Sequence, residues 1–174
     1  MDTKISKILL CSDLSENSRP AFLRAASIAL KFDASLVILH VLEGTAPVTE
    51  RTLANMIGVD KLEEIKKKNT ETAKGLLVGK ATDRAVLGDS LDAFCEMAVQ
   101  NRPECTVPRN TIVIGEGIVA EEILRQAQEQ KCDMIVMGHV VRNRVAEAVM
   151  GSVARDVVRH AKVPVLLVPI AAKD

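Results

Sequence analysis

Aromatic residues are scarce in this chain. Of 174 residues, none is Trp or Tyr, and only three are Phe. Proteins that bind single-stranded nucleic acids stack bases on exposed aromatic rings, and this chain has too few rings for such a surface. Its 23 Lys and Arg balance its 23 Asp and Glu, so no overall positive field attracts phosphate backbones either. We therefore expect no nucleic-acid partner.

Metal-ligand patterns are also missing. The four cysteines include no CxxC pair, and the three histidines are scattered, whereas zinc sites use ligands at short, fixed spacings. We expect no metal centre, and thiols that are buried or incidental.

Long apolar runs are absent too. No run approaches the roughly 20 residues that cross a membrane, and the N-terminal stretch lacks the apolar core and cleavage site of a signal peptide. With 48% apolar and 26% charged residues, the composition is that of a globular protein. We expect one domain over residues 1–174, in the cytoplasm, with no membrane partner.

Signatures of catalysis are not found. The chain has no GxGxxG after its first apolar run, no GxxxxGK[ST] and no GxSxG. Its Ser, His and Asp residues suggest no triad. The SGG-type and HxGH-type loops of α/β folds that activate substrates with ATP are replaced by CSDLSENS. We predict a protein that is not an enzyme and has no catalytic residues; slow ATP hydrolysis stays open.

What the chain does contain is an alternation of apolar runs with amphipathic stretches. Short runs predict buried strands, and apolar residues three or four apart predict helices. A buried parallel sheet explains runs that are apolar almost throughout. The expected fold class is therefore α/β: a three-layer, doubly wound, five-stranded parallel sheet. The predicted strands are Lys7–Ser12, Ser35–Leu42, Thr111–Ile114, Met134–Met137 and Val163–Val168, and the last helix is expected from about Ala146 to His160.

The section from about 44 to 110 is less regular. LEEIKKKNTETAKGLL predicts an exposed helix, and Asp89 can start a short second helix after Gly88. Pro103 and Pro108 bar any helix from continuing. We interpret the section as an elaborated helical connection and not as a separate domain.

Ligands of open parallel sheets bind beyond the carboxyl ends of the strands. Residues that follow or end the predicted strands are Asp13, His40, Val41, Gly115, Gly117 and Gly138. Structural explanations stay open beside a ligand role. Asp13 can cap the first helix, His40 can be a hydrogen-bonded core residue, Gly117 can serve a turn, and His139 can be an inert loop residue.

Three stretches resemble the universal stress protein family: KILLCSDLS, LVILHVLE, and the region from Met137-Gly138 through GSVARDVVRHAKVPVLLV. The resemblance covers nearly the whole chain and is weakest at 44–110. It implies the adenine nucleotide alpha hydrolase-like fold with sheet order 3-2-1-4-5. It also implies a homodimer, which we expect through the apolar edge strand Val163–Val168.

ATP-binding members of that family carry G-x2-G-x9-G-[ST]. This chain keeps the spacing of Gly138, Gly151 and Ser152 but has Val141 in place of the middle glycine. In such a loop glycine commonly takes a positive φ, which a β-branched residue disfavours, so we expect a strained or remodelled loop at Val141. Ala154 also lacks the hydroxyl that binders often present to phosphates.

By resemblance the site would hold ATP or another adenine nucleotide, with Mg²⁺ as its companion. Asp13 would meet adenine or ribose, Val41 would bond adenine through its backbone, and ribose and phosphates would contact Gly138, Val141, Gly151, Ser152 and Val153. Arg142 and Arg144 can supply charge to the phosphates or be ordinary surface arginines. Gly151 and Ser152 can also be only the entry to the last helix.

The leading hypothesis is a stress-response or regulatory protein whose nucleotide site is degenerate, so that ATP binds weakly or not at all. One alternative is a genuine ATP-binding switch in which an arginine compensates for Val141. A second alternative is an interaction protein that uses the 44–110 connection to recruit a partner of unknown identity.

Overall fold

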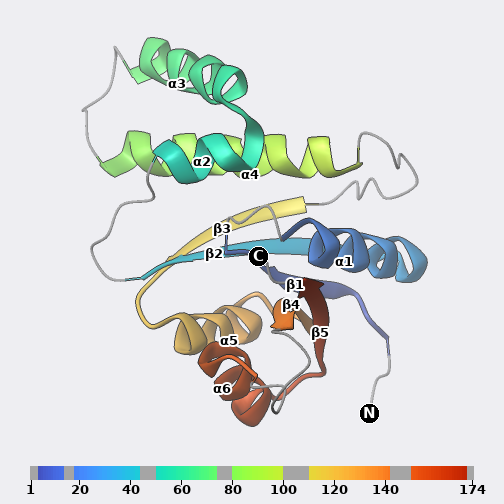
Figure 1. The fold of residues 1–174 in the computed structure, drawn as a ribbon. Coiled ribbons are helices and arrows are strands. Elements are labelled where there is room, and N and C mark those ends of the chain that lie inside the picture. The colour runs from blue at the N-terminus through green and yellow to red at the C-terminus, as the bar shows by residue number, and fades with distance from the viewer. Residues whose placement is uncertain are drawn as a thin grey trace.

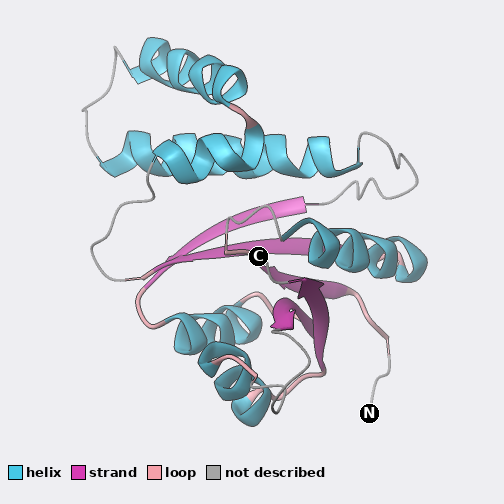
Figure 2. Cartoon of the chain, in the orientation of Figure 1, coloured by secondary structure: helices cyan, strands magenta, loops and turns pink. Residues whose placement is uncertain are grey.

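The computed structural model describes residues 4–13, 18–43, 50–73, 80–99, 110–141 and 150–171. In this part of the chain five strands form one parallel sheet in the order β3-β2-β1-β4-β5, with helices on both faces (Figures 1 and 2). The α/β class, the parallel sheet and its strand order are therefore confirmed. No helix within the described residues is long and apolar enough to cross a membrane.

The central strand and one of its two neighbours are almost fully apolar. They are β1 (Lys7–Cys11) and β2 (Ser35–Leu42), as predicted to within one residue. Ile8, Leu9 and Leu36 are completely buried because helices cover the sheet on both sides. The other strands are β3 (Asn110–Glu116), β4 (Met134–Val141) and β5 (Val165–Ala171).

One face of the sheet is covered by α1 (Ser18–Phe32) and α4 (Lys80–Val99), as Figure 1 shows. Ala25, Ala26 and Ala29 of α1 are buried there with Phe22, which meets Phe94 of α4 edge to face at 6.2 Å between ring centroids. Small alanine side chains let α1 lie close to the sheet. The aromatic pair joins α1 to α4.

The opposite face is covered by α5 (Val119–Glu129) and α6 (Ser152–His160). Ile123 and Ala127 of α5, and Ala154 and Val157 of α6, pack on odd-numbered residues of the central strands, such as Leu9. Alternation along each strand thus divides the core into two clusters. Helix α6 begins at Ser152, whereas the prediction began it at about Ala146; Met150 and Gly151 are not helical.

The connection between β2 and β3 differs most from the prediction. Besides α4 it contains α2 (Glu50–Ile57) and α3 (Val59–Ala73), and α3 lies outside α4, farther from the sheet (Figure 1). The predicted short helix from Asp89 is present as part of α4, but its predicted start is wrong, because α4 begins at Lys80 and runs through Gly88. The buried apolar stripe of Leu87, Leu91 and Phe94 stabilises the helix on both sides of Gly88.

Strands β4 and β5 are both shifted relative to their predicted ends. β4 was expected to end at Met137, but it continues through Gly138 to Val141. β5 was expected over Val163–Val168 and instead runs from Val165 to Ala171. The two extensions pair with each other, up to Val141 with Ala171. Each strand supplies the ladder partners that keep the other extended.

Candidate functional site

The carboxyl end of β1 carries a chain of hydroxyl and carboxylate groups. The Ser12 hydroxyl donates to the Ser18 hydroxyl at 3.3 Å, and the Ser18 hydroxyl donates to Asp13 Oδ1 at 2.7 Å. Ser18 opens α1, so Asp13 is attached to the start of that helix while its side chain stays exposed. Asp13 thus contacts the start of the first helix, as its predicted capping role requires in part. Its carboxylate also faces solvent at the carboxyl end of the strands.

His40 lies beside this group on β2. It is 8% exposed, and its Nδ1 lies 2.9 Å from the backbone oxygen of Ser12, so the interpretation as a hydrogen-bonded core residue is confirmed. Burial lowers the pKa of His40, while the bond to Ser12 and the charge of Asp13 act in the opposite direction.

Val41 follows on the same strand. The backbone oxygen of Leu39 accepts from the Ser12 amide at 2.9 Å, and that of Leu42 accepts from the Gly117 amide at 3.0 Å. Backbone groups alternate sides along a strand, so those of Val41 point to the β1 side. The last β1–β2 pair is Cys11 with Leu39. Val41 therefore directs its amide and carbonyl past the end of β1, toward the side of Asp13.

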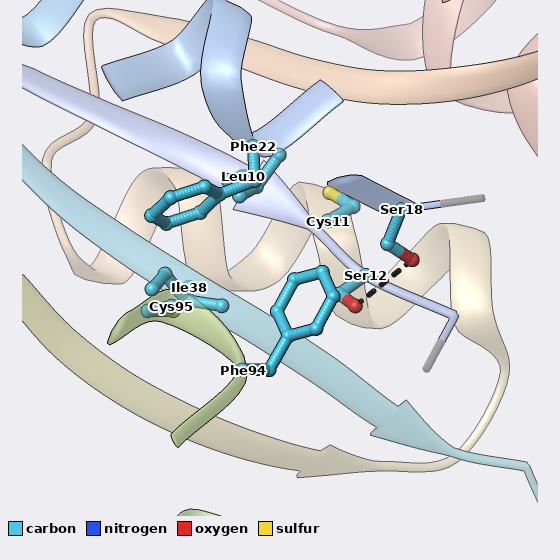
Figure 3. A pocket seen from close by; sticks show the side chains of 8 residues that line it. All are labelled: Leu10, Cys11, Ser12, Ser18, Phe22, Ile38, Phe94 and Cys95. Atoms are coloured by element: carbon cyan, nitrogen blue, oxygen red, sulfur yellow. Dashed lines mark hydrogen bonds between the residues drawn. The ribbon is translucent and has the colours of Figure 1, made fainter. Parts of the chain in front are cut away.

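A narrow crevice runs from Ser12 and Ser18 into the core between β1, β2, α1 and α4 (Figure 3). Phe22 and Phe94 are among the residues that line it, and it leaves no space for a water molecule. The crevice extends the rim inward but has no room for a ligand.

Of the two outcomes expected at Val141, a strained loop or a remodelled one, the structure shows a remodelled backbone. Val141 is a β4 residue paired with Ala171, and it is not among the described residues with positive φ. β-Branched residues favour extended backbone, so valine stabilises a strand here instead of straining a turn. The chain therefore does not turn at the position of the missing glycine.

Gly138 lies within β4, paired with Val168. It has no positive φ, so its backbone does not require glycine. A Cβ at this position would overlap Ile170 Cδ1 and stand 3.3 Å from Ile170 Cγ1. Ile170 lies beyond the predicted end of the last strand, so the sequence pattern does not indicate this contact.

The start of α6 keeps an open geometry. Gly151 is its N-cap, with φ −54° and no side-chain capping bond, and nothing lies within 4 Å of the position where its Cβ would be. Gly151 and Ser152 are exposed, Val153 is half-buried, and Ala154 is buried in the core. The first turn has no acidic residue, so the partial positive charge of the helix start is not offset there.

The remaining predicted positions add little to the described site. Arg142 and Arg144 lie outside the described residues, and His139 is a half-buried residue of β4 and not a loop residue. Gly117 takes φ +128° directly after β3, which confirms its role in a turn. Within the described ranges no group of three or more His, Cys, Asp or Glu could hold a metal ion.

The described residues suit an adenine nucleotide at some of the predicted positions and not at others. Asp13 and the backbone of Val41 suit the polar edge of adenine or ribose, and the α6 start suits an anion. In contrast, Ile170 covers Gly138 on one face, and Val141 prolongs a strand where a phosphate loop would turn. Of the described residues, those at the start of α6 therefore suit the phosphates better than Gly138 and Val141 do.

Comparison with known proteins gives matches over nearly the whole chain. The family model described as the universal stress protein family matches residues 4–169. A universal stress protein of Thermus aquaticus is 30% identical over 161 residues, covering 92% of this chain and 96% of its own length. One from Methanocaldococcus jannaschii is 24% identical over 176 residues, covering 97% of both chains.

Solved structures give the same fold. A universal stress protein in complex with cAMP aligns with a TM-score of 0.59 and 21% identity, covering 96% of this chain and 98% of its own. The universal stress protein from Archaeoglobus fulgidus in complex with dAMP aligns with a TM-score of 0.55 and 18% identity, covering 97% and 99%.

Proposed function

This chain belongs to the universal stress protein family, and we propose that it has a stress-response or regulatory role with a degenerate adenine-nucleotide site. The observation that carries the proposal is the continuation of β4 through Val141, paired with Ala171. A phosphate cradle needs backbone amides turned toward the ligand, whereas a strand directs them to its neighbours. ATP is then expected to bind weakly or not at all, and we assign the protein no catalytic role.

The residues at the adenine end support the proposal that the site derives from an adenine-nucleotide site. Asp13 is exposed at the carboxyl end of β1, and Val41 directs its backbone groups past that end. Two structural neighbours were solved with cAMP and dAMP, ligands with a single phosphate. If this chain retains affinity for any nucleotide, a monophosphate needs fewer phosphate contacts than ATP does. AMP is therefore the first ligand to test beside ATP.

Nucleotide content of freshly purified protein tests the proposal. We expect little ATP or AMP in the extract of denatured protein, and weak binding of either by calorimetry, with or without Mg²⁺. Replacing Val141 with Gly should raise affinity, because it restores freedom for the chain to turn. Val140→Gly is the matched control, since it loosens the same strand at a position that the family motif leaves open. Stoichiometric ATP released from the native protein would refute the degenerate site.

A genuine ATP-binding switch is the alternative. It is favoured by the exposed start of α6, where neither Gly151 nor an acidic side chain blocks an anion. In that case wild-type protein binds ATP, and replacing Arg142 and Arg144 together with Ala weakens it. Tight binding that survives the double substitution would exclude the arginines as compensating groups.

We also propose a homodimer through β5, the sheet edge next to β4. Pro164 accepts a hydrogen bond from Ile135 of β4. By alternation, the backbone groups of Val165 and Leu167 then point away from β4, toward the free edge. Pro169 shares that outward direction, where its missing N–H removes no bond to β4.

Hydrogen exchange resolves this edge residue by residue. In a β5-paired dimer the amides of Val165 and Leu167 are protected, and the protection falls on dilution to monomer. The amides of Leu166 and Val168 serve as internal controls, because they face β4 in either state. Fast exchange at Val165 and Leu167 in protein that sediments as a dimer would place the interface elsewhere.

A further inference from the structure

The space beside Gly138 is filled by a side chain of the same protein. Glycine has no Cβ, so it can take a positive φ and it leaves the volume of a side chain empty. Where its φ is ordinary, the benefit of glycine to a ligand is this empty volume. At Gly138 that volume overlaps Ile170 Cδ1, with Cγ1 at 3.3 Å from the missing Cβ. The side chain that occupies the glycine gap is 7% exposed.

The two residues share one face of the sheet. Val136 and Val168 belong to the cluster beneath α1, and side chains two positions further along a strand point to the same side. Gly138 and Ile170 therefore lie on the α1 face. The last β1–β4 pair is Cys11 with Met137, so Gly138 stands where β1 ends and Asp13 begins the rim.

Ile170 can hold this place because β5 is long. It pairs with Val140 of β4, and the ladder continues for one more pair. Were β5 to end at Val168, nothing on it would reach the gap. The same extension that keeps Val141 in the strand thus also brings the Ile170 side chain over Gly138.

We propose that Ile170 is the residue that excludes nucleotide from Gly138, so that the glycine is retained for packing and not for a ligand. The inference rests on the proposed function, since it concerns the same nucleotide site, and it names a second cause of degeneracy beside Val141. Isoleucine exceeds valine by the Cδ1 atom, the atom that overlaps the missing Cβ. Ile170→Val therefore removes the blocking atom and keeps a β-branched strand residue.

Packing is tested without any ligand. Gly138→Ala should lower the unfolding midpoint, and the loss should shrink when Ile170→Val is added, because the alanine methyl then has room. Val168→Ala, on the same face of β5, should give no such rescue. Equal losses from Gly138→Ala with and without Ile170→Val would overturn the packing role.

Binding is tested in the Val141→Gly background by calorimetry with AMP. Adding Ile170→Val should raise affinity by about tenfold, the low end of the worth of one methylene in a pocket, whereas Val168→Ala should not. Suppose that the Val141→Gly variant binds AMP and that neither Ile170→Val nor Ile170→Ala, added to it, changes the affinity. This result would overturn the inference and leave the proposed function standing. If no variant binds AMP or ATP, the proposed nucleotide site fails, and this inference fails with it.

Discussion

The side chain of Glu122 on α5 fills the gap left by Gly115 on β3. A Cβ at Gly115 would stand 2.5 Å from Glu122 Cγ and 2.6 Å from its Oε1. Gly115 is buried and pairs with Val41, so the contact fixes the carboxyl end of β3 next to the proposed adenine edge. The buried carboxylate is tolerated at this point because both of its oxygens accept hydrogen bonds, from Arg125 and Gln126.

Gly115→Ala should lower the free energy of unfolding by about 1 to 3 kcal/mol, the usual cost of overpacking a core. The matched control is Gly88→Ala in α4, where nothing lies within 4 Å of the missing Cβ. That change should stabilise the protein by up to about 1 kcal/mol through helix propensity. Urea unfolding measures both, and a Gly115→Ala variant as stable as the wild type would show that Glu122 moves aside freely.

Glu122 should make stability fall in acid. Hydrogen bonds from Arg125, at 2.7 Å and 2.5 Å, hold the pKa of Glu122 below its ordinary value of 4.5; burial opposes this, and a bond from Gln126 assists. Because the folded pKa is the lower one, the contribution is complete above 4.5 and is lost as pH falls through the folded pKa.

Glu122→Gln checks this assignment. At pH 7 the variant should be less stable by about 1 to 3 kcal/mol, since a bond to a charged partner is lost. In urea unfolding, the difference from wild type should shrink as pH falls below 4.5. Glu121→Gln, on the exposed side of the same helix turn, should leave the pH profile unchanged. Parallel profiles for wild type and Glu122→Gln would assign the acid dependence to other groups.

The central sheet could be predicted because burial on both faces produces apolar runs that admit few alternatives. Ser35–Leu42 is such a run, and its predicted bounds match β2. The strand order came from the family resemblance and not from the runs, since periodicity does not specify neighbours. α2 was not predicted; it has only eight residues, three of them buried.

The nucleotide site could be predicted as a set of positions but not as a geometry. Gly138, Gly151 and Ser152 keep the family spacing, yet spacing does not show whether the chain turns at Val141 or stays in a strand. That choice depends on Ala171, 30 positions later, which supplies the ladder partner. The pairing of Ile170 with the Gly138 gap is likewise a long-range contact that no local pattern contains.

The described cysteines should be unreactive in the folded protein. Burial raises the pKa of Cys11 to about 12, of Cys95 to about 12 and of Cys132 to about 11, with smaller contributions from nearby acidic or thiol groups. At pH 8 the thiolate fraction then falls about 100-fold or more below that of an ordinary cysteine, and the thiolate is the reactive form. In a Cys105→Ala background, an aromatic disulfide reagent should react with three thiols only after denaturant is added. Rapid labelling of the native variant would contradict the assignment.

The pKa of His40 should lie below its ordinary value, and the charge of Asp13 should limit the size of this decrease. Burial lowers the pKa of His40 from 6.5, the hydrogen bond to the Ser12 carbonyl raises it, and the negative charge of Asp13 raises it further. Asp13→Asn removes that charge but keeps an oxygen that can accept from Ser18, so the pKa of His40 should move lower still. NMR titration of the His40 ring protons measures the shift directly.

The sign for stability follows from the same pKa. The unfolded chain takes up a proton near pH 6.5 and the folded chain only at lower pH, so the contribution of His40 is complete above 6.5 and is lost as pH falls toward the folded pKa. Asp13→Asn should therefore extend this loss to lower pH. Asp33→Asn is the matched control, because it makes the same charge change at the far end of α1, where Asn tolerates the φ of 51°. An unchanged His40 pKa in Asp13→Asn, or an equal shift in Asp33→Asn, would show that Asp13 does not act on the ring, and the two residues would then not belong to one electrostatic unit at the rim.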